Sequence, residues 1–407
     1  MSKEITGQPL TTALARENAP ELLRNDVDER ITKLRPMATP VDQISRYAAT
    51  RHCRSMTVDY YAVATRADST AVSSDTDELT VAADGNDTIT LYVDDPKTFD
   101  PSETVMLPDS LTAEGEPVVL YIEQVTDRAL KVRPVNAAPT PTGELSIGAL
   151  NKGARVIRMG RAAGELDVQT SQYEALPEKK QNYCQIFKTQ IEQSTLMRAA
   201  DKEVGWTFSD QEEVAVYDMR LGMERSFLFG RKARLTDTSK KSEVFLTGGI
   251  WHQAGKSATY PKGKLTGADW LRVMSAAFTG HAGSARKILI AGTELIEQLS
   301  LLEGNNRVML PGDVVSRWGL DFTEMHSKFG TLYVIHSEVL DSCGHAADGL
   351  IIDPEYLTKY VHVPFSATTL DLRTSGQRNT EAVVLTEVSC LVLRYPEAHV
   401  RVTAATA

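Results

Sequence analysis

Residues 209–232, "SDQEEVAVYDMRLGMERSFLFGRK", decide the fold because their spacing predicts one long helix. Ser209 and Glu212 match a capping box, in which a hydroxyl and a carboxylate accept hydrogen bonds from free N–H groups at a helix start. Gly230 is typical of a residue that ends a helix in the left-handed conformation. The helix between them has about 20 residues, or roughly 30 Å. Its apolar stripe, which we expect to be buried, consists of Val214, Tyr217, Leu221 and Leu228.

The composition is that of a globular protein, with 407 residues, 42% hydrophobic and 24% charged, and a net charge of −10. This length predicts two or three structural units. The acidic balance argues against a dedicated nucleic-acid binder, which usually carries a basic patch. The N-terminus lacks the apolar stretch of a signal peptide, and the longest apolar runs, of about five residues, are too short to cross a bilayer. We therefore expect a soluble protein.

The four cysteines, Cys53, Cys184, Cys343 and Cys390, lie far apart in the sequence and form no C-x-x-C pair. This spacing indicates neither a zinc site nor a disulfide framework. A reduced, cytosolic place of synthesis is the simpler interpretation.

Strand patterns crowd together in the first half of the chain. Stretches rich in β-branched and aromatic residues, separated by polar turns, occur at 55–68, 87–95, 103–109, 116–136 and 154–160. Short strands at this spacing predict a small β-barrel or sandwich, here an inserted module at about 75–155. We expect residues 56–66 and 155–170 to form the two sides of a long hairpin that carries this module.

The second half of the chain mixes helix and strand patterns. They predict a helix over 266–283, a buried strand at 286–292, a helix over 293–304, a hairpin turning at 328–330 and two final strands within 381–403. The first 50 residues are highly charged and contain few apolar residues, so they cannot form a core of their own. We expect an extended arm that packs on another surface. Without a regular βαβ alternation, the predicted class is α+β.

No motif with a recognised catalytic mechanism is present: there is no P-loop, no G-x-G-x-x-G after a strand, no H-E-x-x-H and no G-x-S-x-G. Cys343 and His345 could form a nucleophile and its base, but no orienting third residue is identified, so a loop cysteine near a surface histidine is the preferred interpretation. The acidic stretches "SSDTDE" and "YVDDPKTFD" do not match a calcium loop. We predict no catalytic, cofactor-binding or metal-binding residues, and a structural or binding role.

Arg220 and Glu224 lie four residues apart on the predicted helix. They can pair with each other, which would stabilise the helix by about 0.3 kcal/mol, or meet charges on a neighbouring chain. Both alternatives stay open at the level of the sequence.

The order of these parts resembles the major capsid proteins of tailed bacteriophages with the Hong Kong 97-type fold, and within them a subfamily that has a β-domain inserted in the extended loop. The resemblance spans nearly the whole chain and rests on the order and spacing of its stretches. These are "VDERITKLRPMATPVDQI" (27–44), the β-rich segment that ends in "GARVIRMGRAAGE", "NYCQIFKTQIEQS" (182–194), "MRLGMERSFLFGRK" (219–232) followed by "LTGGI" (246–250), "KFGTLYVIHSEVLD" (328–341) and "LTEVSCLVLRYPEAHVRV" (385–402).

The resemblance implies a division of the chain into the parts of that fold. These would be an N-terminal arm at 1–50, an extended loop at 51–175 with the β-module at about 75–155, a peripheral domain at 176–285 with the spine helix at 209–230, an axial domain at 286–380, and a return to the peripheral domain at 381–407.

It also implies a structural subunit, not an enzyme, that self-assembles into hexamers and pentamers of an icosahedral phage head enclosing double-stranded DNA. The implied partners are further copies of the chain, portal, scaffolding and decoration proteins, and DNA contacted weakly and non-specifically, with no cofactor and no membrane. The implied location is the virion capsid, after synthesis in the bacterial host cytoplasm. No lysine–asparagine pair for a covalent cross-link can be identified. The candidates for contact between subunits are Arg35, Tyr60, Tyr61, Arg220, Glu224 and Arg225.

Three alternatives stay open. The chain could be the shell of an encapsulin-like cellular compartment with an enzyme cargo. It could be a soluble hydrolase that uses Cys343 and His345, or a β-rich adhesion or decoration protein built around residues 75–155.

Overall fold

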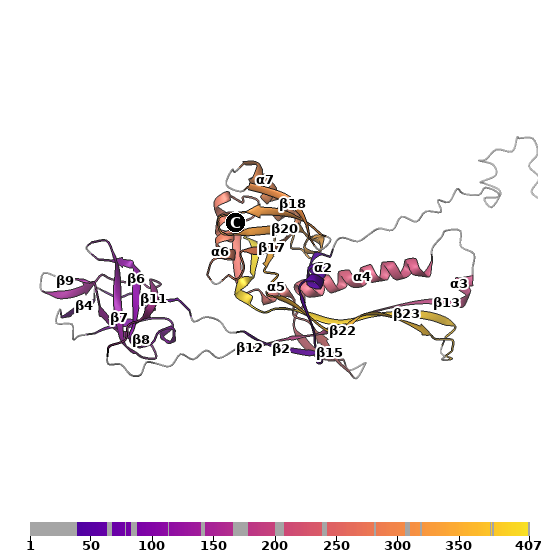
Figure 1. Ribbon diagram of the computed structural model, residues 1–407, viewed down its shortest axis with the longest axis horizontal. Helices are drawn as coiled ribbons and strands as arrows, with labels where there is room; N and C mark the ends of the chain where they lie inside the picture. Colours follow the sequence, from indigo (N-terminus) through magenta and orange to yellow (C-terminus); the bar gives the residue numbers. More distant parts are fainter. Residues whose placement is uncertain are drawn as a thin grey trace, which may run out of the picture. The chain divides into compact units, whose positions relative to one another are not determined.

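The computed structural model describes residues 39–62, 67–77, 79–82, 88–112, 114–139, 143–165, 178–199, 207–237, 242–280, 282–305, 310–317, 320–374, 376 and 378–405. It divides into two compact units, one formed by Met1–Ala62 with Lys179–Ala407 and the other by Val63–Glu178. The predicted α+β class is confirmed, with more strand than helix (Figure 1). Most of the expected N-terminal arm lies outside the described residues.

A four-stranded sheet runs along one side of the first unit. Its order is β1 (Ala49–His52), β22 (Leu357–Asp371), β23 (Thr380–Leu393) and β13 (Gln185–Ser194). β1 pairs with β22 in parallel, and the other pairs are antiparallel. The long helix α4 (Phe208–Phe229) packs on this sheet, where the Phe227 ring meets the Phe187 ring edge to face at 5.6 Å (Figure 1).

The second sheet of this unit has seven strands. Their order is β16 (Lys256–Pro261), β24 (Val400–Ala405), β21 (Gly349–Ile352), β17 (Arg286–Ala291), β20 (Thr331–His336), β19 (Leu320–His326) and β18 (Leu310–Arg317). Side chains alternate between its faces. Ile288 and Ile290 join the core shared with α4, α5 (Ile250–Gln253) and α8 (Glu338–Ser342). Leu289 and Ala291 join the core formed with α6 (Gly267–Phe278) and α7 (Thr293–Asn305).

The predicted boundaries at 285 and 380 do not follow these sheets. β22, expected in the axial part, pairs with β23 in the four-stranded sheet, and the final strand β24 lies inside the seven-stranded sheet between β16 and β21. β16 and α6, expected in the peripheral part, also belong to the seven-stranded sheet and its core. These pairings join segments that are far apart in the sequence, so local patterns did not reveal them.

α4 confirms the predicted long helix but differs in its start and its buried face. The N-cap is Thr207, which forms the capping box with Asp210, two residues before the predicted pair. The buried residues are Met219, Met223, Glu224, Phe227 and Leu228, whereas Val214 is 45% exposed. Of the predicted stripe, Leu228 is buried and Leu221 packs against the core, whereas Val214 was wrong, because the core lies along the second half of the helix.

The helix ends at Gly230 because of close packing and not because of a left-handed conformation. The φ angle of Gly230 is −51°, which any residue can adopt. A Cβ atom at Gly230 would lie 2.4 Å from the Ser226 carbonyl oxygen and 2.5 Å from the Thr247 carbonyl oxygen. A Cβ at Gly249 would lie 2.3 Å from the Leu228 carbonyl oxygen. The glycines of "LFG" and "LTGGI" thus let two backbone segments cross in contact.

Two two-stranded sheets and several short helices complete the described part of this unit. β2 (Thr57–Ala62) pairs with β12 (Glu178–Tyr183), and β14 (Ala233–Asp237) pairs with β15 (Ser242–Leu246). The predicted partner of residues 56–66 was 155–170, and this was wrong: β12 is the partner. The remaining helical elements are α2 (Pro40–Tyr47), α3 (Thr195–Ala199) and the 3-10 helix η3 (Pro396–Ala398).

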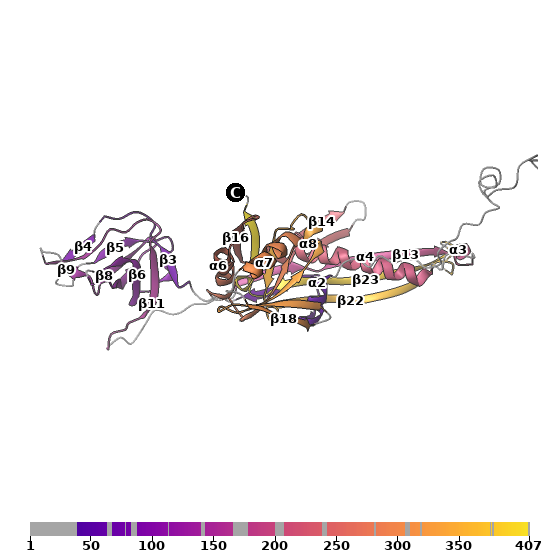
Figure 2. The same ribbon diagram turned by 90° about the horizontal axis from the view of Figure 1, so that it is seen from above.

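In its described residues, the second unit consists of strands and one 3-10 helix, η2 (Pro96–Thr98) (Figure 2). Its six-stranded sheet has the order β3 (Ser69–Ala71), β11 (Arg155–Arg161), β6 (Glu103–Leu111), β7 (Pro117–Val125), β8 (Ala129–Pro134) and β5 (Ile89–Tyr92). A three-stranded sheet has the order β4 (Leu79–Ala82), β10 (Glu144–Ile147) and β9 (Ala138–Pro139). Residues of both sheets share one apolar core. The strands extend from Ser69 to Arg161, a wider range than the expected 75–155.

Candidate functional site

A cluster of charged side chains lies between the first described helix and the long helix. We call it the α2–α4 ionic cluster. It draws on α2, α4, β22 and β23 and consists of Asp42, Arg46, Arg220, Glu224, Lys359 and Glu387. Asp42 and Glu224 are fully buried, and Lys359 and Glu387 nearly so. Buried charges are costly unless they are paired, so the cluster must be satisfied by specific contacts.

Glu224 holds the start of α2 against α4. Its Oε1 accepts a hydrogen bond from the Val41 backbone N–H at 2.9 Å, and its Oε2 accepts one from the Asp42 N–H at 2.7 Å. The first N–H groups of a helix have no partner within the helix, and here a side chain 182 residues later in the sequence supplies it. The contact fixes the point at which the N-terminal segment joins the first unit.

The other charges form alternating ion pairs. The Arg220 guanidinium lies 3.3 Å from Asp42 Oδ2 and 3.1 Å from Glu387 Oε2. The Lys359 ammonium lies 2.8 Å from Glu387 Oε1 and 3.5 Å from Asp42 Oδ1. Arg220 also stacks over the Phe365 ring, 4.7 Å from its centre. Two buried carboxylates therefore face the buried Lys359 and the partly exposed Arg220.

Glu224 has no cation in this arrangement, since none of the ion pairs among the described residues includes it. Burial raises the pKa of Glu224 to about 8, while its two backbone hydrogen bonds lower the pKa by less. Glu224 therefore holds its proton at neutral pH, beside ion pairs in which Asp42 and Glu387 face Arg46, Arg220 and Lys359.

This pKa predicts a pH-dependent stability. The folded protein holds the Glu224 proton more tightly than the unfolded chain, so the free energy of unfolding falls as the pH rises from about 5 to 8, by at most about 1.4 kcal/mol per pH unit. Glu224→Gln cannot titrate. In urea unfolding, the free energy of unfolding of the wild type should fall relative to that of Glu224→Gln as the pH rises from about 5.5 to 7.5. A difference that does not change with pH would contradict the raised pKa.

Some of the residues predicted to contact other subunits are buried, and others are exposed. Arg220 and Glu224 do not pair with each other but with the partners above, and Glu224 is buried within the protomer, so the expectation that it meets a neighbour was wrong. Tyr60 is also buried, whereas Tyr61 is 62% exposed and Arg225 is exposed. Arg35 lies outside the described residues.

Sequence reasoning missed Asp42, Lys359 and Glu387. One signal was present: Glu387 interrupts the apolar run "VVLTEVSCLVL", and a charge in a buried strand needs a partner. The identity of its partners was not visible, because Arg220 and Lys359 reach Glu387 only through tertiary contacts.

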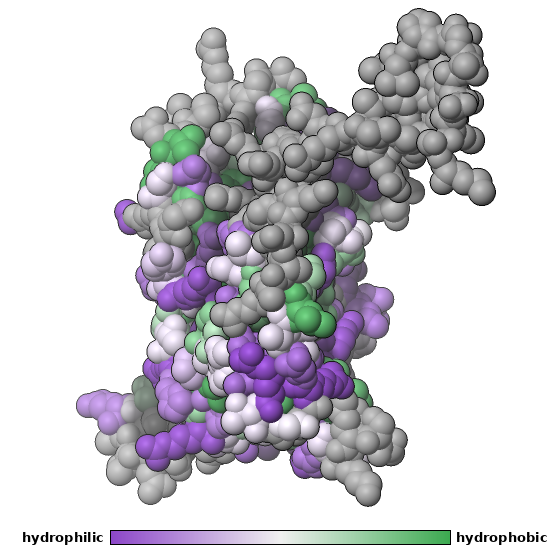
Figure 3. Space-filling model, turned by 90° about the vertical axis from the view of Figure 1, so that its right-hand side faces the viewer, coloured by the Kyte–Doolittle hydropathy of each residue, from purple (hydrophilic) through white to green (hydrophobic). Residues whose placement is uncertain are grey.

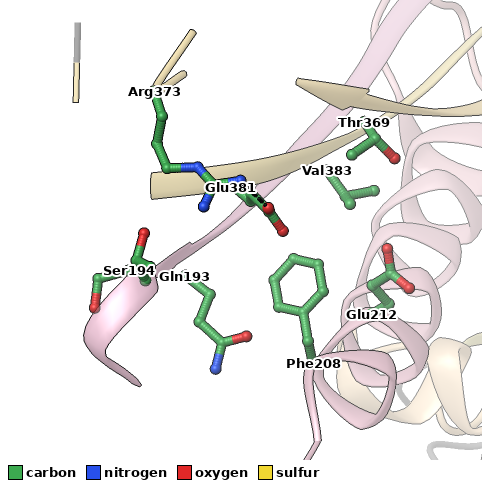
Figure 4. A pocket seen from close by; sticks show the side chains of 9 residues that line it. Gln193, Ser194, Phe208, Glu212, Thr369, Arg373, Glu381 and Val383 are labelled. Carbon is green, nitrogen blue, oxygen red and sulfur yellow. Dashed lines mark hydrogen bonds and ion pairs between the residues drawn. The ribbon is translucent and has the colours of Figure 1, made fainter. Parts of the chain in front are cut away.

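A cavity of about 260 Å³ lies where α4 begins, between the end of β13 and the strands β22 and β23 (Figure 4). The Phe208 ring lies between Gln193 and Glu212, and the ion pair of Arg373 with Glu381 lies across from it. None of the described lining residues is a histidine or a cysteine, so this cavity offers no nucleophile–histidine pair.

Figure 3, which views the end of the first unit where α3 and the β22–β23 turn lie, shows apolar patches between polar ones. The exposed apolar residues of α3, α4 and β22 include Leu196, Met197, Val214 and Leu370.

The proposed nucleophile pair is not assembled. His345 Nδ1 lies 2.7 Å from Asp348 Oδ2, and its ring stacks on Phe229 with 4.6 Å between the ring centres. Cys343 is exposed, and no hydrogen bond between described residues joins it to His345.

In the part of the chain that the structure describes, no group of three or more His, Cys, Asp or Glu could hold a metal ion. None of the described helices is long and apolar enough to span a membrane.

Comparisons with known proteins found similar solved structures and one matching family model. Solved structures with similarity include one from Gordonia phage Cozz (12% identity, 100% of each chain covered, TM-score 0.46) and the capsid of a native GTA particle (9% identity, 98% of this chain and 100% of that chain, TM-score 0.48). Another is an encapsulin complex from Synechococcus elongatus (10% identity, 56% of this chain and 77% of that chain, TM-score 0.38). No curated protein matches the sequence. The family model described as SU10 major capsid protein matches residues 5–406. The chain therefore belongs to the SU10 major capsid protein family.

Proposed function

We propose that this capsid subunit assembles into hexamers and pentamers of an icosahedral phage head that encloses double-stranded DNA, with the Hong Kong 97-type fold and without enzymatic activity. The observation that carries the proposal is the match to a major capsid protein family over residues 5–406. The acidic net charge of −10 agrees with a wall that binds DNA weakly, since phosphate contacts dominate affinity for DNA.

The parts of the chain would have distinct roles in the shell. The N-terminal arm at 1–50 would reach over neighbouring subunits, and the α2–α4 ionic cluster would fix α2 within it. The unit Val63–Glu178 would be a β-module inserted in the extended loop, which begins and ends at the paired strands β2 and β12. Exposed apolar side chains at the end of the first unit are typical of surfaces that become buried on association. Portal, scaffolding and decoration proteins would be further partners, and assembly would take place in the bacterial host cytoplasm.

The content of the particle tests this proposal against the encapsulin-like alternative. Particles purified from cells that express the chain with its neighbouring genes should contain double-stranded DNA that survives nuclease treatment. Particles that hold an enzyme and no DNA would contradict the phage head and support a cellular compartment.

Tyr61 and Arg225 are the exposed candidates for contact between subunits. Tyrosine and arginine often carry much of an interface's energy, so Tyr61→Ser combined with Arg225→Ala should raise the protein concentration needed for assembly by at least about tenfold. The free energy of unfolding of the unassembled chain should change by no more than about 0.5 kcal/mol, because exposed side chains contribute little to it. Sedimentation across a concentration series measures the first and urea unfolding the second. Unchanged assembly would remove both residues from the interface.

A further inference from the structure

Three of the four cysteines form a row inside the first unit. The Sγ atoms of Cys53 and Cys184 are 3.6 Å apart, and those of Cys184 and Cys390 are also 3.6 Å apart. All three are free thiols, and Cys184 and Cys390 are fully buried whereas Cys53 is half-buried. A disulfide has an S–S length of about 2.05 Å, so a rotation of the side chains that closes about 1.5 Å would suffice to join neighbouring sulfurs.

The backbone holds these thiols in place. The Cys53 N–H donates to the Val361 carbonyl oxygen at 3.0 Å, and the Cys184 N–H donates to the Met56 carbonyl oxygen at 2.8 Å. His362 Nδ1 lies 2.9 Å from the Cys53 carbonyl oxygen. Apolar side chains surround the row. Cys53, which precedes β2, and Cys184, which follows β12, are therefore held at the same end of these paired strands.

We propose that Cys53 and Cys184 are an oxidation site, which closes to a disulfide when the protein meets a low-molecular-weight disulfide. One protein thiolate attacks a sulfur of the reagent, forms a mixed disulfide and releases one reagent thiolate. The second protein thiolate then attacks the protein sulfur of the mixed disulfide, forms the Cys53–Cys184 bond and releases the other reagent thiolate. The two protons of the protein thiols pass to the two released thiolates, so the reagent is reduced by two electrons and the protein is oxidised by two.

The bond joins Cys53 to Cys184 because of access and geometry. Cys53 is the one thiol of the row that a reagent can reach, since the other two are fully buried. Cys184 and Cys390 continue the antiparallel ladder in which Gln185 pairs with Ser389, and residues directly opposite in a ladder are held about 4.5–5.5 Å apart at Cβ, which strains a disulfide. Burial raises the pKa of the Cys53 thiol to about 12, so its attack on the reagent is slow, whereas the hydrogen bond with Cys390 lowers the pKa of the Cys184 thiol and favours Cys184 as the thiolate of the second step.

The disulfide would close a large part of the chain into one covalent loop. Cys53 and Cys184 are 131 residues apart, and the whole unit Val63–Glu178 lies between them in the sequence. Closing a long loop restricts the unfolded chain most, so the disulfide would stabilise the site where β2 and β12 leave the first unit. It would form in the same way whatever the chain assembles into.

Peptide mapping tests the proposal on the full-length chain. The purified protein is incubated with glutathione disulfide, its free thiols are alkylated, and it is digested with trypsin without reduction. The digest should contain residues 52–54 ("HCR") linked to residues 181–188 ("QNYCQIFK"), and a reductant should separate the two peptides. The linked pair should be lost in Cys53→Ser and kept in Cys390→Ser and in Cys343→Ser.

Two results would overturn the proposal. One is a wild-type digest without the linked pair although the exposed Cys343 in the same sample has reacted with glutathione, which shows that the reagent was active. The other is a link between residues 181–188 and the peptide 379–394 that contains Cys390, which would place the bond in the ladder instead. Cys53→Ala repeats the test if Cys53→Ser fails to fold.

Discussion

Replacing Glu224 with alanine should detach α2 from α4. The substitution leaves the buried N–H groups of Val41 and Asp42 without their acceptors and should cost about 3 kcal/mol of local stability. Trypsin should then cleave after Arg46 and Arg51 roughly 100-fold faster in the unassembled chain, because cleavage follows the population of the opened segment. Timed digestion followed by mass spectrometry measures this rate.

Asp218→Ala is the matched control, because Asp218 is exposed on the same helix and its loss should leave the cleavage rate nearly unchanged. Glu224→Gln keeps a carbonyl acceptor and should fall between the wild type and Glu224→Ala. Equal cleavage rates in Glu224→Ala and Asp218→Ala would show that the α2–α4 ionic cluster does not hold the N-terminal helix.

The second large effect is expected at Gly249. A Cβ atom there would lie 2.3 Å from the Leu228 carbonyl oxygen and 2.7 Å from the Gly230 nitrogen, so Gly249→Ala forces two backbone segments apart. The Gly249 N–H donates to the Gly230 carbonyl oxygen at 2.8 Å, and this bond would break with the contact. We expect a loss of at least about 3 kcal/mol in the free energy of unfolding, and little soluble protein.

Gly222→Ala should instead raise the free energy of unfolding, because Gly222 lies inside α4. No atom lies within 4 Å of a Cβ at Gly222, and alanine favours a helix interior over glycine by about 0.5–1 kcal/mol. Urea unfolding of both variants should therefore show opposite signs. A Gly249→Ala protein as stable as the wild type would mean that the crossing of "LTGGI" over the end of α4 is not tight.

The helices and strands were predictable where one segment carries its own signal. The capping pattern predicted α4 to within two residues at its start, and stretches rich in β-branched and aromatic residues predicted β6, β7, β8 and β11. The pairing of β2 with β12 and the place of β24 inside the seven-stranded sheet were not predictable, because each depends on contacts across most of the chain.

The buried charges show the same limit at the level of the site. Glu224 was named from the sequence as a contact candidate, and its partners were sought four residues away or on another chain. Its actual partners, the N–H groups of α2, lie 182 and 183 residues away. No local pattern couples a glutamate in one helix to the first turn of another, so only the fold could assign its role.

Electron microscopy of the chain expressed together with its neighbouring genes, combined with sedimentation, tests the proposed shell most directly. Closed icosahedral particles built of hexamers and pentamers are the predicted result. A chain that stays a stable monomer both alone and with those genes would contradict the proposed assembly.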